Sequence, residues 1–318
     1  MDSAIANTDR RSIGIIASAV SGLLVMDDTF SIADFNPSRH RLIGKGLWGY
    51  VYDISDGTVL KLVREHCPGI GNGRRKVENE WKALIALAQI ASIKKLIPRP
   101  KAIGVVPDNS SVAATGFAVW LRMERIEGQG LSVASLAAMS RSDRNRYGEA
   151  IGTALAELHD ALRILPADFT QGADDPYADI KRAVSEIPFY RSVIATIERR
   201  RAKIPHQDLQ ICHNDFNITN LLFRHHDVSG ILDFAECRLG YREKDISDIL
   251  KDAPSLEDTL VRAYERVSAT RIDADRIKLG LAENYLYGAV INERGRGIEC
   301  VQCNRDRLLQ KFTALGYS

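Results

Sequence analysis

The stretch that decides the fold is "ICHNDFNITNLLF", residues 211–223, which is followed shortly by "ILDFAE" at 231–236. Short hydrogen-bonding side chains recur between the apolar runs of these segments, namely His213, Asp215, Asn217, Asn220 and Asp233. A solvated loop does not need so many of them bracketed by Ile, Leu and Phe. The pattern is typical of a site that holds a metal ion and phosphate.

A glycine-rich stretch earlier in the chain indicates the same chemistry. It reads "GKGLWGYVY", residues 44–52, and its β-branched and aromatic end places it in a strand–turn–strand. A dinucleotide-binding loop opens a helix instead, which disfavours a dehydrogenase. Glycines in such a turn let backbone N–H groups approach phosphate oxygens. The alternative is a plain hairpin with flexible glycines, and the residues that we expect to contact a nucleotide are Gly44, Gly46, Gly49 and Val51.

A lysine in the next apolar run extends the phosphate-binding set. Lys61 lies in "VLKLV", between Leu60 and Leu62. One interpretation is an edge-strand lysine whose head reaches water. The other is a lysine aimed into a cleft to hold phosphates and kept charged by a carboxylate on the following helix. We prefer the second, with Glu80 as the partner and Glu78 as the alternative.

In chain order these residues match the parts of a kinase-type site. Asp215 would accept the proton of the attacking hydroxyl or orient it. Asn220 and Asp233 would supply oxygens to Mg²⁺, which takes few protein ligands and leaves the rest to phosphates and water. His213 is expected to brace the loop. The sequence therefore predicts phosphoryl transfer from ATP or GTP, with Asp215, Asn220 and Asp233 as the catalytic residues and the last two as metal ligands.

The chain changes from strand-rich to helix-rich along its length. Strands are expected over about 30–63, with a hairpin turn at 55–57, and within 114–128; helices are expected over 76–95, over 143–165 and in most of the chain beyond 240. This predicts an α+β, bilobal fold with a cleft between the lobes. Its parts are a helical N-terminal extension over 1–38, an N-lobe over 39–127 with the nucleotide-binding sheet, and a C-lobe over 128–318 with the catalytic loop and the acceptor-binding helices.

The net charge and the apolar segments restrict the classes of binding partner and the cellular compartment that we expect for this protein. A net charge of +2 argues against a broad nucleic-acid footprint. The apolar run at 12–26 follows Arg10-Arg11, but it is shorter than the roughly twenty residues that cross a bilayer. Its spacing favours an amphipathic helix packed on the body over an export signal, which would need a cleavage site. We expect a cytoplasmic protein with no membrane or nucleic-acid partner, and the oligomeric state cannot be read.

The cysteines are expected to be reduced. Their number, 5, is odd, and most of them are far apart, so a disulfide framework is not expected in a chain of this size. Cys300 and Cys303 form a lone CxxC without a second pair or a nearby His. Half a zinc site and a redox pair are the alternatives to free thiols near a helix.

Over about 40–255 the chain resembles the aminoglycoside phosphotransferase and choline kinase-like family of small-molecule kinases, which shares the protein-kinase fold. "HND" at 213–215 is similar to the family's HGD or HND, and "ILDFAECRLGYREKDIS" at 231–247 to its metal-binding segment. "IGTALAELHDA" at 151–161 resembles its "LARLH" helix, and "LRMERIEG" at 121–128 resembles its hinge. The resemblance implies a five-stranded sheet with one main helix in the N-lobe and a mostly helical C-lobe. It also implies Asp233 on the metal, Asp245 in the lobe core, and adenine held near Met123, Glu124 and Ile126.

Departures from protein kinases favour a small acceptor. Asn214 stands where regulated protein kinases carry Arg, and Phe234-Ala235 replaces "FG". The interval between Asp233 and Asp245 has no room for a long activation segment. We therefore predict transfer to a hydroxyl of an aminoglycoside-like compound, an amino alcohol or a sugar. The alternatives are an atypical protein kinase and a nucleotide-binding pseudokinase acting as a regulatory module.

The acceptor itself is not readable from the sequence. Carboxylates cluster after the metal-binding aspartate and favour a cationic acceptor, namely Glu236, Glu243, Asp248 and Asp252. Cations are interleaved with them, so a solvated charged face is an equally good interpretation: Arg238, Arg242 and Lys244. "NERGRG" at 292–297 would instead suit an anionic acceptor.

Overall fold

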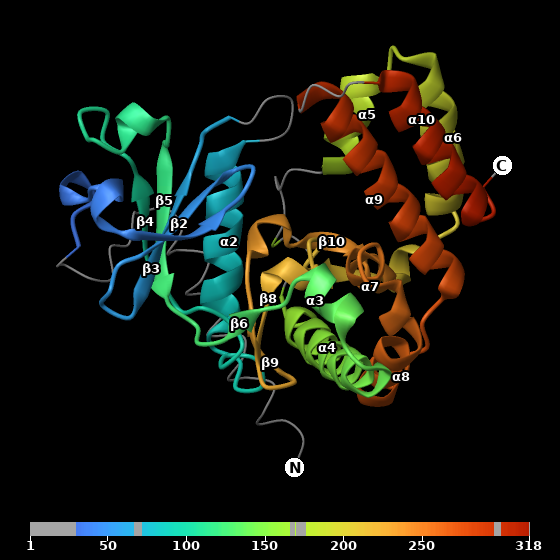
Figure 1. Cartoon of the computed structure of the whole chain (residues 1–318), viewed down its shortest axis with the longest axis horizontal. Coiled ribbons are helices and arrows are strands. Elements are labelled where there is room, and N and C mark those ends of the chain that lie inside the picture. The colour runs from blue at the N-terminus through green and yellow to red at the C-terminus, as the bar shows by residue number, and fades with distance from the viewer. Residues whose placement is uncertain (1–29, 67–71, 166–168, 170–175, 296–299, 318) are drawn as a thin grey trace.

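The computed structural model describes residues 30–66, 72–165, 169, 176–295 and 300–317, which form two lobes (Figure 1). The smaller lobe is built on an antiparallel sheet in the spatial order β1-β2-β3-β5-β4. Its strands are β1 (Arg41–Lys45), β2 (Gly49–Asp53), β3 (Thr58–Val63), β4 (Pro100–Val105) and β5 (Val119–Glu124). The five-stranded sheet that the family resemblance implies is confirmed. The sequence patterns did not predict β4, which begins at a proline, a position that a strand tolerates at its first residue.

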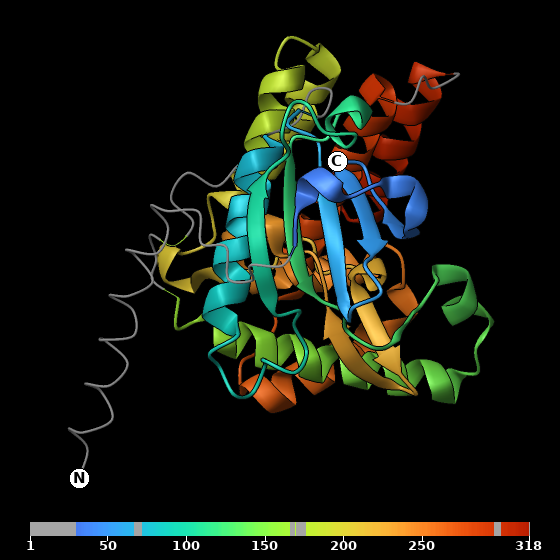
Figure 2. The same cartoon turned by 90° about the vertical axis from the view of Figure 1, so that its left-hand side faces the viewer.

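One helix, α2 (Gly73–Leu87), packs behind this sheet, as Figure 2 shows. It begins earlier than the predicted Lys76 because the Asn72 side chain caps it by accepting the Arg75 N–H. It also ends earlier than the predicted Lys95, and the chain continues as turns. Val77 and Leu84 of its apolar stripe are fully buried.

The larger lobe is mostly helical, as predicted. Its helices are α3 (Val133–Ala138), α4 (Arg141–Leu162), α5 (Pro176–Val184), α6 (Pro188–Arg201), α7 (Arg242–Leu250), α8 (Glu257–Ser268), α9 (Ala274–Gly295) and α10 (Val301–Ala314). Short strands form a three-stranded sheet and a pair: β6 (Gln129–Gly130), β8 (Leu221–Arg224) and β9 (Asp227–Ile231), and β7 (Leu209–Cys212) with β10 (Arg238–Tyr241). The largest hydrophobic core runs through both lobes, and a second one joins α5, α6, α9 and α10.

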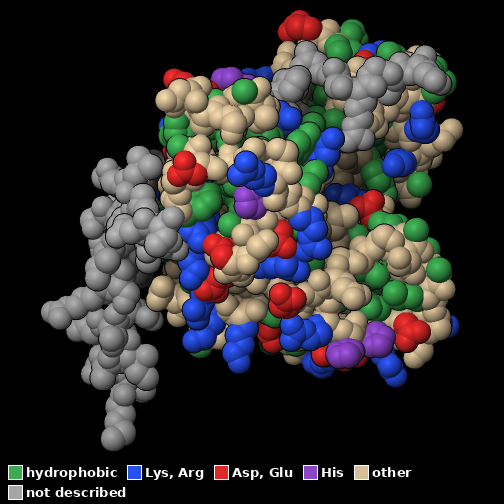
Figure 3. Space-filling model, turned by 60° about the vertical axis from the view of Figure 1, so that its left-hand side comes forward, with side chains coloured by type: hydrophobic (Ala, Val, Ile, Leu, Met, Phe, Trp, Pro, Cys, Tyr) green, Lys and Arg blue, Asp and Glu red, His purple; other side chains and the backbone are tan. Residues whose placement is uncertain are grey.

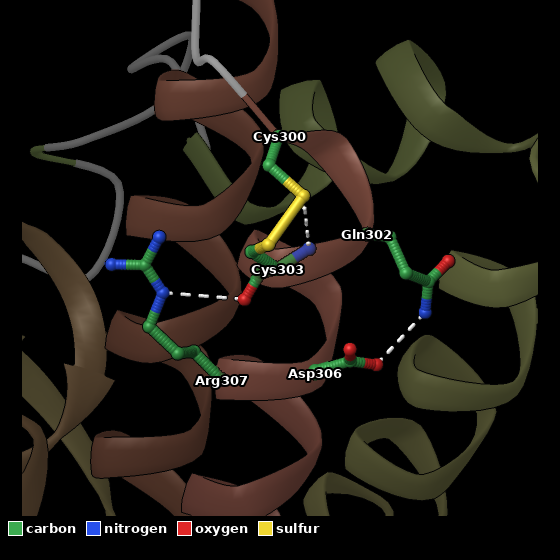
Figure 4. The surroundings of a disulfide bond; sticks show 5 residues. All are labelled: Cys300, Gln302, Cys303, Asp306 and Arg307. Carbon is green, nitrogen blue, oxygen red and sulfur yellow. Dashed lines mark hydrogen bonds between the residues drawn. A yellow bond between two sulfur atoms is a disulfide. The ribbon is translucent and has the colours of Figure 1, made fainter.

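A disulfide joins Cys300 and Cys303 at the start of α10 (Figure 4). The expectation of free thiols is therefore wrong for this pair. Cys300 is the N-cap residue, and its Sγ accepts the Cys303 N–H at 3.0 Å, so the helical turn brings the two Cα atoms to 5.3 Å. Cys212 and Cys237 are free and buried, as expected of the others. Cys67 lies outside the described residues.

The other expectations concern the N-terminal region, membrane-crossing helices and the distribution of surface charge. The predicted helix over 12–26 lies outside the described residues and stays a prediction. The expectation of strand from about residue 30 is wrong at its start, because short 3-10 turns occupy Ile32–Asp34 and Pro37–Arg39 and β1 begins only at Arg41. In the described part of the chain, no helix has the length and apolarity to cross a membrane. On the face shown in Figure 3, basic and acidic side chains are interspersed rather than gathered by sign.

Candidate active site

A cleft of about 1340 Å³ lies between the lobes. All the residues that the sequence assigned to nucleotide, metal or catalysis line it: Gly44, Gly46, Gly49, Val51, Lys61, Glu80, Met123, Glu124, Ile126, Asp215, Asn220 and Asp233. The structure thus brings together side chains that lie far apart in the sequence, some in the smaller lobe and some in the larger one. Met123 and Glu124 end β5, and Ile126 follows in the segment that connects the lobes.

The glycine-rich turn joins β1 to β2 along the cleft. The Gly46 N–H donates to the Gly49 carbonyl at 2.9 Å, which closes the turn. A Cβ at Gly49 would lie 2.0 Å from the Leu62 carbonyl of β3, so only glycine fits there without moving the strand. The loop backbone is therefore held close to the position where phosphates would enter.

Lys61 joins the two lobes through its ammonium. Its Nζ lies 2.7 Å from Glu80 Oε2 and 2.8 Å from Asp233 Oδ1. Glu78, the alternative partner, is exposed. Burial disfavours the charge of Lys61, but the Asp233 and Glu80 carboxylates outweigh it and raise the lysine pKa above its usual value. Burial likewise disfavours the Asp233 carboxylate, yet Lys61 holds its pKa below the usual range. Lys61 and Asp233 are thus charged at neutral pH, whereas burial raises the pKa of Glu80 above its usual value.

The loop that carries Asp215 follows β7, and the side chain of Asp245 supports it from the interior of the lobe. Asp245 is fully buried; its Oδ2 accepts the His213 N–H at 2.9 Å and its Oδ1 accepts the Asn214 N–H at 2.6 Å. His159 Nε2 lies 2.8 Å from Asp245 Oδ2. The buried His213 ring lies 3.1 Å through Nε2 from the Leu232 carbonyl, which fits the bracing role that we expected. Asn214 takes a left-handed conformation (φ 60°), which Asn tolerates better than most residues.

Two amides orient the Asp215 carboxylate. Asn217 Nδ2 donates to Asp215 Oδ1 at 2.8 Å, and Asn220 Nδ2 donates to Asp215 Oδ2 at 2.9 Å. Burial, with the nearby carboxylates Asp233 and Asp248, raises the pKa of Asp215 to about 7. A carboxylate tuned close to the working pH is suited to act as a general base.

This pKa is directly measurable in the nucleotide-free protein. We expect carboxyl ¹³C NMR, with Asp215→Asn to assign the signal, to show Asp215 titrating near pH 7, far above a free aspartate at about 3.9. Asp233→Asn removes one of the raising charges, so the titration should shift to lower pH. A titration of Asp215 near pH 4 in the wild-type protein would contradict this description of the site.

Asn220 and Asp233 can hold a hard cation. Asn220 uses its amide nitrogen on Asp215, so its Oδ1 is the atom that a metal would take. Asp233 follows β9 in a left-handed conformation (φ 64°) that few non-glycine residues adopt, which is typical of functional sites. One carboxylate and one amide oxygen are ligands that Mg²⁺ accepts beside phosphate and water.

Sequence reasoning missed the way α2 fixes both loops. Lys76 lies one turn before Glu80. Its Nζ pairs with Glu236, which follows the loop that carries Asp233, and lies 4.9 Å from the Trp48 ring of the glycine-rich turn. Asn79 Nδ2 donates to the Ala235 carbonyl at 3.0 Å and to the Cys237 carbonyl at 2.8 Å. The sequence did contain a signal for this role. Lys76 lies four residues before Glu80, so the two side chains share one face of the helix.

We therefore expect Lys76→Met to weaken nucleotide binding. The substitution releases both the Trp48 turn and Glu236, and a desolvated cation–π contact alone contributes about 2 kcal/mol, which is a loss of roughly tenfold or more in affinity. Calorimetric titration with Mg²⁺-ADP measures it. Lys82→Met is the matched control, because this lysine of the same helix is partly buried and its ammonium forms no ion pair, hydrogen bond or cation–π contact with the described residues. Equal affinities in the two variants would show that the contact has no such role.

The far side of the cleft corrects the interpretation of a solvated charged face. Glu243, Lys244 and Asp248 are all buried, and of these Lys244 and Asp248 line the cleft together with Glu236. Asp252 is exposed. The side chains of 294–297 in "NERGRG" lie outside the described residues, so a contact from them stays a prediction.

Comparisons with known proteins agree with this geometry. The family model of the phosphotransferase enzyme family matches residues 43–278. A search of curated protein sequences found no match. Among solved structures, the amicoumacin kinase hAmiN in complex with AMP-PNP, Ca²⁺ and Ami has a TM-score of 0.63 at 13% identity, over 94% of this chain and 93% of that one.

Two further solved structures show the same fold at low identity. The GDP and kanamycin complex of APH(2")-IIia has a TM-score of 0.60 at 15% identity, over 88% of this chain and 95% of that one. A choline/ethanolamine kinase family protein from Mesorhizobium loti has a TM-score of 0.59 at 18% identity, over 95% of each chain. With the family model covering most of its length, the chain belongs to the phosphotransferase enzyme family and is a phosphotransferase with an alcohol group as acceptor.

Proposed function

We propose that this enzyme transfers the γ-phosphate of ATP or GTP to a hydroxyl group of a small molecule, with Asp215 as the base and Mg²⁺ held by Asn220 and Asp233. The observation that carries the proposal is the meeting of two contacts in one cleft. Lys61 lies 2.8 Å from Asp233, and Asn220 lies 2.9 Å from Asp215, so phosphate-binding, metal-binding and proton-accepting groups are adjacent.

The residues divide the reaction between them. Lys61 and the glycine-rich turn would hold and orient the phosphates, and the backbone near Glu124 and Ile126, next to Met123, would hold the base of the nucleotide. Bound Mg²⁺ would neutralise charge on the transferred group. The hydroxyl oxygen forms a bond to the γ-phosphorus, the bond from that phosphorus to the bridging oxygen of the leaving nucleoside diphosphate breaks, and the hydroxyl proton passes to Asp215.

The segment after Asp233 favours a small acceptor over a protein. Residues Phe234–Glu236 form a 3-10 turn, β10 then pairs with β7, and α7 begins at Arg242. Every residue of this interval is used in the body of the lobe, and none remains for a segment that could present a protein substrate. ATP and GTP are abundant in the cytoplasm, which is where we place the reaction.

Release of nucleoside diphosphate tests the proposal. Mg²⁺-ATP or Mg²⁺-GTP is supplied with aminoglycosides, amino alcohols, sugars and nucleosides, and phosphorylated products are identified by mass spectrometry. We expect one acceptor class to stimulate release strongly over the rate with water alone. Nucleotide binding without release from any small acceptor would instead favour a pseudokinase, and label on added proteins would favour a protein kinase.

A further inference from the structure

The wall of the cleft beyond Asp215 contains buried charges on two facing helices. Lys244, Asp248 and Lys251 follow one another at intervals of four and three residues, so they share one face at the end of α7, and all three line the cleft. Glu283 and Asn284 line it from α9. Buried charged groups are normally paired, so any atom here without a partner indicates what the wall is built to bind.

Asp248 has one oxygen with a partner and one without. Its Oδ1 accepts from Lys244 Nζ at 2.5 Å, and the same ammonium donates to Asn284 Oδ1 at 2.9 Å. Its Oδ2 is buried and accepts no hydrogen bond from any described residue, although the side chain is only 2% exposed. A buried carboxylate oxygen without a donor costs free energy, so this atom is placed to receive a donor from a ligand.

Glu283 presents a second such oxygen from the facing helix. Its Oε1 is buried, accepts no hydrogen bond within the described chain, and lies 3.5 Å from Arg201 Nη1. The residue is 9% exposed and lines the cleft. Glu283 Oε1 thus has an ion-pair partner in Arg201 but accepts no hydrogen bond, and Asp248 Oδ2 accepts none either; the two residues line the same cleft from different helices.

Lys251 supplies the opposite charge. It is half-buried and lines the cleft, and within the described part of the chain its ammonium has neither an ion pair nor a hydrogen bond. It follows α7 on the face that carries Lys244 and Asp248, and it lines the same cleft as Asp215. An anionic group of an acceptor bound at Asp215 would meet Lys251.

The charges on this side of the cleft are balanced. The cations that line it are Arg201, Arg238, Lys244 and Lys251, and the carboxylates are Asp215, Glu236, Asp248 and Glu283. A polycationic acceptor would need an excess of carboxylates, and a polyanionic one an excess of cations. This side of the cleft has equal numbers of cations and carboxylates. Among the described residues it also has an unpaired ammonium and two carboxylate oxygens that accept no hydrogen bond, so it suits a ligand that carries both charges.

We propose, on the basis of the function proposed above, that the acceptor is a small zwitterionic alcohol. Its ammonium group donates to Asp248 Oδ2 and Glu283 Oε1, its anionic group binds Lys251, and its hydroxyl lies at Asp215. The anionic group is a carboxylate or a phosphate, two chemistries that a lysine recognises alike.

Two matched series of acceptors change one charge at a time. The first comprises glucosamine 6-phosphate, glucosamine, glucose 6-phosphate and glucose; the second comprises homoserine, 3-aminopropanol, 4-hydroxybutanoate and 1-propanol. Kanamycin serves as the polycation. With Mg²⁺-ATP, we expect the zwitterion to have the highest kcat/KM in at least one series, by about tenfold or more over its singly charged analogues, and the series in which this holds identifies the anion.

The outcomes separate the two proposals. If the zwitterion has the highest kcat/KM in neither series, or if kanamycin exceeds both zwitterions, the zwitterionic acceptor is overturned while the proposed function stands. If no acceptor of either charge stimulates ADP release, the proposed function fails, and this inference fails with it.

Variants test the two contacts separately. Lys251→Gln should raise the KM of the zwitterion by about tenfold or more and leave that of the amine-only analogue unchanged. Asp248→Asn should act on the ammonium-bearing acceptors and leave the anion-only analogue unchanged. Lys94→Gln, at an exposed lysine beyond α2, is the control for loss of charge. Unchanged Mg²⁺-ADP affinity checks that each variant folds, and equal effects on all acceptors would overturn the assignment.

Discussion

Asp215→Asn is expected to lower acceptor-dependent phosphoryl transfer by about 10²–10⁴-fold while Mg²⁺-nucleotide affinity is retained. An amide cannot take the proton of the hydroxyl, but it is the same size as the carboxylate and keeps an oxygen for Asn217 or Asn220. The loss should therefore appear in kcat, measured as nucleoside diphosphate release at saturating acceptor. Asp160→Asn, an exposed aspartate of α4, is the matched control and should retain the wild-type rate. A wild-type rate in Asp215→Asn would remove the base from the mechanism.

The same variant has a predictable effect on stability. The Asp215 pKa is about 7 in the folded protein and about 3.9 when unfolded, so the ionised carboxylate costs folding free energy. This cost is absent below about pH 4, grows as the pH rises, and is complete above about pH 7. In metal-free denaturant titrations, the unfolding free energy of Asp215→Asn relative to the wild type should therefore increase between pH 4 and pH 7. A difference that does not change with pH would contradict the raised pKa.

Lys61→Met is expected to damage both stability and catalysis. Glu80 is only 1% exposed and would lose its positive partner, and breaking a buried ion pair typically costs about 3–5 kcal/mol. We expect the lower end of this range, because Asp233, the other partner, is 40% exposed. Removing one preorganised charge from the phosphates should also lower kcat by about 10²–10³-fold. Denaturant unfolding and the ADP-release assay measure the two effects.

A second substitution distinguishes the two losses. Lys61→Met with Glu80→Gln removes the uncompensated carboxylate, so stability should largely return while activity stays lost. Lys101→Met breaks the exposed pair with Glu124 on the neighbouring strand and should cost less than about 1 kcal/mol. If Lys61→Met lowers the free energy of unfolding no more than Lys101→Met does, Lys61 does not form the main stabilising ion pair of the cleft.

The gathering of the proposed nucleotide-site residues in one cleft could be predicted because their sequence patterns are local. The glycine turn, the strand lysine and the catalytic loop each depend on residue types at short spacing, and the structure places Gly49, Lys61 and Asp215 in one cleft. The choice of Glu80 over Glu78 required only that the lysine partner lie on the inner face of α2.

The parts that could not be predicted depend on packing between distant segments. Asp248 and Glu283 line one cleft because α7 packs on α9, and neither sequence segment encodes that contact alone. For the same reason the sequence did not show that part of the charged segment after Asp233 is buried, as Lys244 is. The disulfide was missed because Cys300 caps a helix whose start the sequence did not mark.

The most direct test of the central claim is the destination of the γ-phosphate. Wild-type enzyme is incubated with Mg²⁺ and ATP labelled at the γ-position, together with the acceptor that best stimulates ADP release, and the labelled products are separated. We predict that the label appears on an alcohol oxygen of the small molecule as a phosphate monoester, and that with Asp215→Asn it appears there about 10²–10⁴-fold more slowly. Label recovered only as inorganic phosphate or on protein would contradict the assignment of this site as a small-molecule kinase.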